Sequence, residues 1–83
     1  MTTTLRLTLY GREQCHLCQD MVAALHITLA GVAFQLQVVD VDQSPELEKR
    51  YGQFVPVLMA GEVEICHFHL DRTALDAYLA KIR

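Results

Sequence analysis

Two cysteines with two residues between them, Cys15 and Cys18, are the part of this 83-residue sequence best suited to covalent chemistry. Thiol–disulfide exchange needs a thiolate that attacks, a route for the substrate, and a second thiol that resolves the mixed disulfide. Zinc sites use cysteines at the same spacing, so the pair by itself is compatible with redox chemistry and with metal ligation. The third cysteine, Cys66, makes the number odd and does not suggest a framework of structural disulfides.

The segments on either side of the pair predict a strand followed by a helix. Apolar and polar residues alternate over residues 5–10, which is the pattern of a strand, and residues 11–14 predict a polar turn. Apolar residues then recur at helical spacing before Gly31, which is expected to end the helix: Cys18, Met21, Val22, Leu25 and Leu29. Cys15 is therefore expected in the first turn of a helix that directly follows a strand.

This placement predicts different roles for the two thiols. At a helix start, unpaired backbone N–H groups and the positive end of the dipole favour the thiolate of Cys15 and lower its pKa. Arg12 is expected to add a cation nearby, which Glu13 would oppose, and His16 is expected to stabilise the thiolate when protonated. The Arg12 and His16 side chains are also expected to bind the substrate. Cys18 begins the apolar face and is expected to be more buried. We therefore predict Cys15 as the attacking thiol and Cys18 as the resolving thiol.

The rest of the chain predicts three further strands and two helices. Residues 34–41 are rich in apolar and β-branched side chains, and Ser44-Pro45-Glu46 predicts the start of a short helix that ends near Gly52. Residues 55–59 and 63–68 predict two strands joined by a two-residue turn at Gly61-Glu62. Asp71 is expected to cap a last helix, whose apolar face comprises Leu75, Tyr78, Leu79 and Ile82.

This order of elements predicts a single α/β domain over residues 1–83, with a four-stranded mixed sheet and helices on both faces. The first two strands should be parallel because a helix joins them, and the last two should form an antiparallel hairpin. Pro56 has no N–H to give to a sheet, so it is expected at the very start of its strand.

The composition excludes several classes of partner. The net charge is −3 and the lysines and arginines are scattered, which argues against nucleic acid. No apolar run approaches the roughly 20 residues of a membrane-spanning helix. The first residues, 1–6, lack the layout of a secretory signal, so a cytoplasmic location is expected, where a cysteine pair is more often reactive or metal-binding than structural.

Two stretches carry a resemblance to a known family: Tyr10-Gly-Arg-Glu-Gln-Cys-His-Leu-Cys18, and Phe54-Val55-Pro56 ahead of the hairpin. With these, the chain resembles the glutaredoxin/thioredoxin superfamily over almost its whole length. It is most similar to short, largely uncharacterised bacterial glutaredoxin-like proteins with a Cys-x-Leu-Cys motif. The resemblance implies a thioredoxin-like fold with sheet order 2-1-3-4, flanked by three helices. It also implies a cis Val55–Pro56 bond, with Pro56 beside the cysteine pair and the backbone of Val55 binding the substrate.

The sequence departs from typical glutaredoxins at two places. Those proteins have Pro-Tyr between the cysteines, where this chain has His16-Leu17, and a Gly-Gly pair before the last helix, where it has His67-Phe68. The glycines let the backbone approach glutathione, and Asp71 matches the acidic residue that follows them or is a helix cap. Glutathione as a co-substrate and a protein dithiol as the reductant therefore both remain open. No bound cofactor is expected, and the expected partner of the monomeric protein is a protein disulfide or a small thiol.

Two other functions remain as alternatives to an oxidoreductase. In the first, Cys66, His67 and His69 join the cysteine pair to bind zinc, whereas the simpler prediction is that Cys66 is a buried, non-catalytic thiol. Against zinc, Cys66 and His67 should point to opposite faces of a strand. In the second, the domain keeps the fold as a non-catalytic binding module. Phe54 is expected at the rim of the cleft beside the proline.

Overall fold

The computed structural model describes residues 4–82 and contains four strands and three α-helices in the predicted order. Residues 1–3, on which part of the prediction about a secretory signal rests, and Arg83 lie outside the described residues. The elements are β1 (Leu5–Gly11), α1 (His16–Thr28), β2 (Phe34–Asp40), the 3₁₀ turn η1 (Val41–Gln43), α2 (Pro45–Tyr51), β3 (Val57–Ala60), β4 (Val63–His67) and α3 (Arg72–Ile82). Among these residues, none of the helices has the length and apolar character needed to cross a membrane.

The strands form one mixed sheet in the order β2-β1-β3-β4. β1 pairs with β2 in parallel, while β3 is antiparallel to both β1 and β4. The parallel pair is joined through α1, as a crossover connection requires. Ala60 pairs with Val63, so Gly61 and Glu62 form the predicted two-residue turn, and Gly61 has a φ of 61°, which a residue without a side chain adopts readily. The thioredoxin-like α/β fold and its strand order are confirmed.

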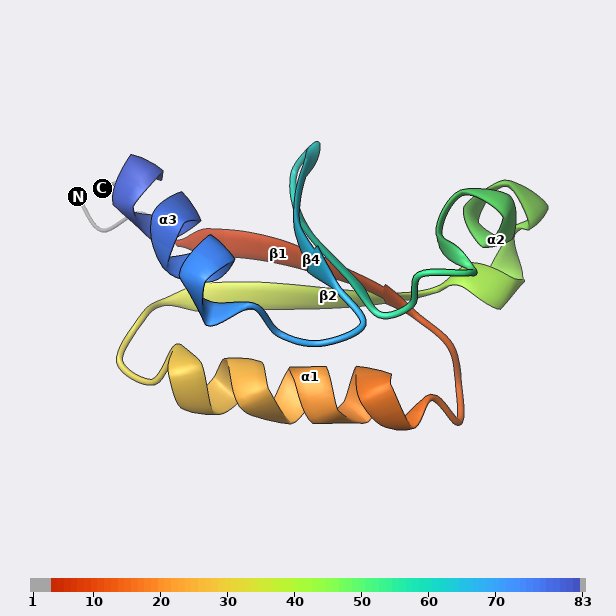
Figure 1. Cartoon of the computed structure of the whole chain (residues 1–83), viewed down its shortest axis with the longest axis horizontal. Helices are drawn as coiled ribbons and strands as arrows, with labels where there is room; N and C mark the ends of the chain where they lie inside the picture. The colour runs from red at the N-terminus through yellow and green to blue at the C-terminus, as the bar shows by residue number, and fades with distance from the viewer. Residues whose placement is uncertain (1–3, 83) are drawn as a thin grey trace.

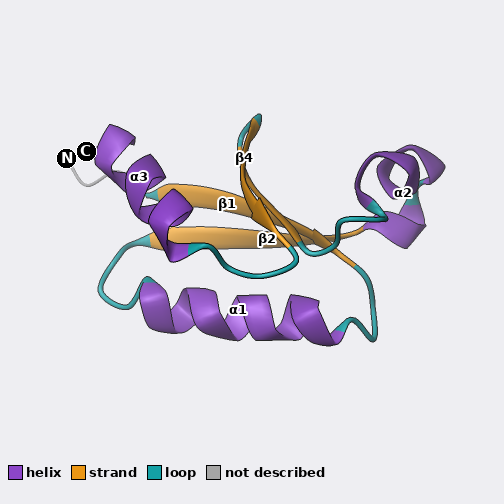
Figure 2. Cartoon of the chain, viewed as in Figure 1, coloured by secondary structure: helices purple, strands orange, loops and turns teal. Residues whose placement is uncertain are grey.

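The two faces of the sheet carry separate apolar cores. α1 and α3 share the core on one face (Figure 1). Their apolar side chains pack there on the alternating leucines of β1 and on β3. On the other face, α2 covers one end of the sheet through a smaller cluster (Figure 2): Val41, Tyr51, Val57 and Met59. Helices therefore lie on both faces, and the alternation of β1 decides which of its residues face α1.

The cysteine segment connects β1 to α1 at the end of the sheet where α2 lies (Figure 1). The predicted apolar face of α1 is buried at Cys18, Met21 and Leu25, which fixes the rotation of the helix about its axis. Gly31 follows the helix with a φ of 84°, a backbone conformation that glycine adopts without strain. The start of α1 is thus fixed by its connection to β1 and by burial of one helical face.

Five local predictions were wrong in detail. The third strand spans Val57–Ala60 rather than 55–59, because Pro56 has no N–H to donate and pairing starts after it. The second strand ends at Asp40, where the η1 turn takes Val41, and the fourth ends one residue earlier than expected, at His67. Ser44, which the sequence predicts as the cap of α2, is its N-cap residue but makes no capping hydrogen bond through its side chain. Ile82 is 43% exposed, because the last turn of α3 extends past the strands (Figure 1).

Candidate active site

Cys15 and Cys18 form a disulfide at the start of α1, with their Cα atoms 5.2 Å apart. Cys15 is the N-cap residue of the helix, and its Sγ accepts a hydrogen bond from the backbone N–H of Cys18 at 3.2 Å. A sulfur at this position faces backbone N–H groups that have no hydrogen-bond acceptor within the helix. These groups stabilise a thiolate more than a neutral thiol. The predicted location of Cys15 at a helix start is confirmed.

Burial distinguishes the two sulfur-bearing residues. Cys15 is partly exposed, whereas Cys18 is only 6% exposed and belongs to the buried face of α1. A substrate therefore has access to Cys15 first. The second thiol is one helical turn away and is shielded from solvent.

Gly11, the last residue of β1, leaves the space that Cys18 occupies. A Cβ at position 11 would lie 2.8 Å from Sγ of Cys18, which is closer than such atoms approach. Sequence reasoning did not single out Gly11. The available signal was a glycine at the end of a strand that leads into the cysteine motif.

The register of the sheet places four residues in one row at the end of the sheet nearest to the cysteines. Tyr10 pairs with Val57, and Val57 pairs with His67, so the residues one step further along each strand also lie beside one another. Together with the pairing of β1 and β2, this gives the row Asp40, Gly11, Pro56 and Phe68. The carbonyl of Pro56 accepts a hydrogen bond from the N–H of Phe68 at 2.9 Å, and the Val55–Pro56 bond is cis. Continued one step past the last β1–β3 pair, the register puts Pro56 opposite Gly11, whose missing side chain leaves room for Sγ of Cys18.

Three aromatic side chains gather at the β4 end of this row. The ring of His67 makes edge contacts with the rings of Phe54 and Phe68, at centroid distances of 5.6 and 4.8 Å. Phe54 is 44% exposed, so it does not belong to the core. Phe68 has a φ of 63°, a strained conformation for a bulky residue that costs on the order of 1–3 kcal/mol.

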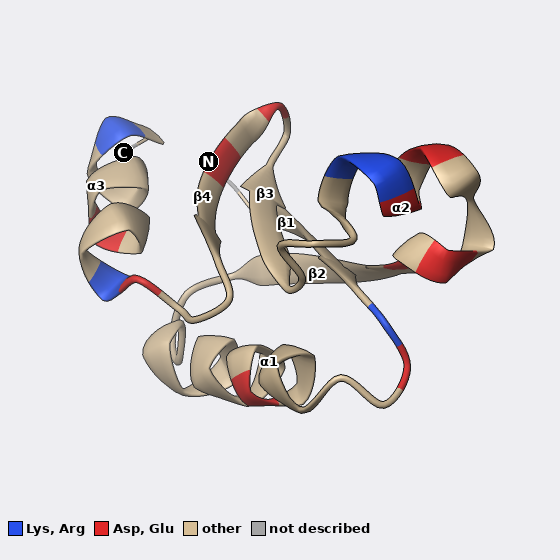
Figure 3. Ribbon diagram, turned by 45° about the vertical axis from the view of Figure 1, so that its right-hand side comes forward, with Lys and Arg blue, Asp and Glu red and all other residues tan. Residues whose placement is uncertain are grey.

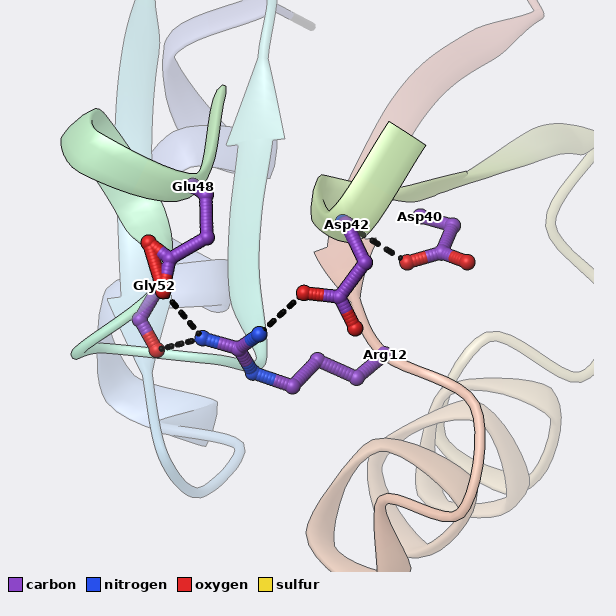
Figure 4. Close-up of polar contacts among 5 residues, drawn as sticks. All are labelled: Arg12, Asp40, Asp42, Glu48 and Gly52. Carbon is purple, nitrogen blue, oxygen red and sulfur yellow. Dashed lines mark hydrogen bonds and ion pairs between the residues drawn. The ribbon is translucent and has the colours of Figure 1, made fainter. Parts of the chain in front are cut away.

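The Arg12 side chain extends away from the cysteine turn to α2 (Figure 4). Its guanidinium donates to Asp42, to Glu48 at 3.0 Å and to the carbonyl of Gly52 at 2.8 Å. The hydrogen bond with Glu48 raises the pKa of Arg12, and the nearby carboxylates add to this effect. Arg12 was predicted as a cation for the thiolate and as a substrate-binding residue, but two carboxylates share its charge. The Arg12 clamp, as we call these four residues, was not predicted from the sequence.

The family model of the Glutaredoxin-like domain (DUF836) matches residues 6–80. This chain belongs to that glutaredoxin-like family. No curated protein matches it.

Several solved structures are similar to this chain. The chain is similar to protein Ne2328 from Nitrosomonas europaea, with 38% identity, a TM-score of 0.85 and 94% of each chain covered. It is similar to protein XcR50 from X. campestris, with 39% identity and a TM-score of 0.69, over 90% of this chain and 96% of that one. Thioredoxin 1 from Thermosipho africanus has the same fold at 19% identity and a TM-score of 0.57, over 90% of this chain and 94% of that one.

In this glutaredoxin-like domain, the side chain of His16 is exposed to solvent and Cys66 lies in the core. The side chain of His16 is 85% exposed and faces Asp20 at 3.5 Å. Within residues 4–82, no three His, Cys, Asp or Glu side chains are grouped to hold a metal ion, so the predicted zinc alternative has no assembled ligand set. Cys66 is buried in the core, and burial raises the pKa of its thiol. His67 is exposed on the same strand, as expected for adjacent residues.

Proposed function

We propose that this protein is a thiol–disulfide oxidoreductase in which Cys15 is the nucleophile and Cys18 the resolving thiol. One observation supports this most directly. Sγ of Cys15, the more exposed cysteine, lies at the N-terminus of α1. It is bonded to Sγ of the buried Cys18 and accepts a hydrogen bond from the backbone N–H of Cys18. Such donors stabilise a thiolate, the form that attacks disulfides.

In the proposed reaction, the Cys15 thiolate attacks one sulfur of a substrate disulfide. A Cys15–substrate disulfide forms, and the other substrate sulfur leaves as a thiolate. The Cys18 thiolate then attacks Cys15, which closes the internal disulfide and releases the second substrate thiolate. Two electrons pass from the protein dithiol to the substrate, and each departing thiolate takes up a proton from solvent.

Val55 and Pro56 complete the proposed site as the place where a substrate backbone binds. This proposal rests on the row of residues at the sheet end, in which Pro56 lies next to Gly11. Glutathione or a protein dithiol would return the disulfide to the dithiol, and a cytoplasmic location would supply either reductant. We propose that the protein acts as a monomer.

The roles of the two thiols can be tested by trapping, in a background in which Cys66 is replaced by alanine. We expect Cys18→Ser to accumulate a mixed disulfide with a substrate from a cell extract, because no resolving thiol remains. The matched variant Cys15→Ser should trap nothing, because the attacking sulfur is gone. Mass spectrometry of the non-reduced adducts measures both. Equal trapping by the two variants would show that the nucleophile is wrongly assigned.

A reduction potential separates the proposed enzyme from a non-catalytic binding module. We expect the Cys15–Cys18 couple to interconvert near the cytosolic range, at about −220 to −320 mV. Equilibration with thiol buffers of known composition measures it. A pair that stays fully oxidised or fully reduced throughout that range would favour the binding module.

A further inference from the structure

Phe54, His67 and Phe68 form an exposed aromatic patch, and two of the three phenylalanines of the chain are in it. Phe54 is 44% exposed and Phe68 is 40% exposed, while the His67 side chain is 40% exposed. The two phenylalanine rings lie 6.4 Å apart, so the three rings present a continuous surface. Large exposed apolar groups that are clustered, rather than scattered singly, are typical of binding surfaces.

The backbone of Phe68 indicates that folding alone does not explain this ring. Its φ of 63° lies in the left-handed region, where glycine is at ease and a bulky side chain is strained. Burial of the ring does not offset this backbone strain, because the ring remains exposed. A strained residue with an exposed ring points to a role in binding.

The aromatic patch lies at the same end of the sheet as the disulfide. Phe68 follows β4 and hydrogen-bonds to Pro56, and Pro56 lies next to Gly11, against which Sγ of Cys18 packs. Adjacent strands are about 4.8 Å apart, so Phe68 is roughly 10 Å from Gly11 across the sheet. A few residues of extended polypeptide span this distance.

The charges around the site do not suit an anionic tripeptide such as glutathione, which carries two carboxylates and one ammonium group. Arg12, the cation nearest to the cysteines in sequence, already binds Asp42 and Glu48. At the edge of the aromatic patch, Glu64 lies 3.2 Å from Nδ1 of His67, so this border carries a carboxylate. A substrate with an apolar side chain and a basic residue is complementary to this surface.

We infer that the aromatic patch binds a large apolar side chain of a polypeptide substrate. The enzyme then acts on protein disulfides in preference to glutathione disulfides. This inference rests on the proposed function. Phe68 and Phe54 are then residues that determine specificity. The Cys15 thiolate attacks the cysteine sulfur of the bound polypeptide, and the electrons follow the path described above. Only the recognition of the substrate is new.

The experiment compares probes that share one leaving group. Each carries a cysteine joined to thionitrobenzoate: a peptide with Phe and Lys beside the cysteine, the same peptide with Ala and Glu, and glutathione itself. Attack on the cysteine sulfur releases coloured thionitrobenzoate, so stopped-flow absorbance with the reduced protein gives a second-order rate constant. We expect the Phe–Lys peptide to react about 10-fold faster than either other probe, the size expected of a good aromatic contact with charge complementarity.

Variants of the aromatic patch assign this preference to its rings. Phe68→Gly and Phe54→Ala should each slow the Phe–Lys peptide by about 3- to 10-fold and leave glutathione within about 2-fold. Glycine suits the backbone at position 68, so the first variant should fold at least as well as the parent. Val63→Ala, which shortens a 52% exposed side chain at the other end of β4, is the matched control and should change neither rate.

The outcomes separate the two proposals. Equal rates for the three probes in the parent protein, or patch variants that slow glutathione as much as the peptide, would overturn the specificity while leaving the oxidoreductase standing. No release of thionitrobenzoate beyond that seen with Cys15→Ser would overturn both.

Discussion

At the residue scale, the contact between Gly11 and Cys18 fixes the position of Sγ of Cys18, the proposed resolving sulfur. Position 11 ends β1, and its missing side chain leaves the volume that Sγ of Cys18 fills. Sequence reasoning identified both cysteines and their relative burial, because spacing and apolar periodicity report on those directly. It could not identify Gly11, because that contact depends on how α1 packs across the end of β1.

We predict that Gly11→Ala destabilises the oxidised protein by about 1–3 kcal/mol, the usual cost of overfilling a packed site. The added methyl must displace Sγ of Cys18, so the equilibrium between dithiol and disulfide should shift as well. Urea unfolding measures the first effect and thiol-buffer equilibration the second.

Gly31→Ala is the contrasting variant. It also costs stability, since Gly31 has a φ of 84°, but nothing lies near its Cβ position and it is far along the chain from the cysteines. Its redox equilibrium should match that of the parent. A Gly11→Ala protein with unchanged stability and redox equilibrium would contradict the packing account.

At the element scale, the Arg12 clamp connects the segment before α1 to α2. Figure 3 shows charged residues on α2 and on the loop that follows β1, and the clamp joins these two regions. Gly52 is part of its geometry, because a Cβ there would collide with the carbonyl of Glu48 and lie 2.7 Å from Nη2 of Arg12. α2 is only seven residues long and is held otherwise by the smaller apolar cluster, so its order should depend on the clamp.

We predict that Arg12→Met accelerates hydrogen exchange of the α2 amides several-fold and leaves those of α1 unchanged, because the ion pairs hold the α2 side of the sheet. The difference from the parent should shrink at high salt, since exposed ion pairs are screened. Arg6→Met on β1 removes another exposed arginine and should not affect α2. Equal exchange of α2 in parent and Arg12→Met would mean that the clamp does not order the helix.

The elements themselves were largely predictable, and their ends were not. The alternation of apolar and polar residues in β1 and the helical spacing of apolar residues in α1 each reflect one buried face. Both patterns can be recognised in the sequence. The ends depend on single residues in three dimensions: Pro56 delays β3, and Asp40, which accepts a hydrogen bond from the N–H of Asp42, ends β2 in the η1 turn. The clamp was missed because Arg12, Asp42 and Glu48 are far apart in sequence, and an arginine beside a cysteine motif suggests a role in catalysis first.

At the scale of the whole molecule, the order of elements predicted a mixed sheet with helices on both faces, and the family resemblance supplied the strand order. What neither supplied is the surface: the aromatic patch combines Phe54 from before β3 with His67 and Phe68 from the end of β4, and only the folded sheet brings them together. Cys66 is a titratable group among the core residues under α1 and α3.

Cys66 makes the stability of the folded molecule depend on pH in the alkaline range. Burial raises the pKa of its thiol, and the charges of Asp71 and Glu64 act in the same direction. The unfolded thiol therefore ionises first. The contribution of this thiol to the free energy of unfolding is fully present below the pKa of the unfolded state, about 8.5. It is lost as the pH rises through the higher pKa of the folded state.

We predict that the unfolding free energy of the oxidised protein falls from about pH 8.5 upward. Cys15 and Cys18 are disulfide-bonded in this form and do not titrate. Cys66→Val, which keeps an apolar side chain at the site, should show a smaller decline when unfolding by urea is followed between pH 7 and pH 10. Identical slopes in parent and variant would contradict the assignment to Cys66.

The central claim is that Cys15 is held as a thiolate at the start of α1, and its ionisation can be measured directly. In the reduced Cys18→Ser, Cys66→Ala protein, Cys15 is the only thiol, and the N–H of residue 18 that donates to it is retained. The rate of alkylation by iodoacetamide, followed against pH, reports the thiolate fraction. The account predicts a pKa well below the free value of about 8.5, whereas a Cys15 that stays protonated to that value or beyond, or that does not react at any pH, would contradict it.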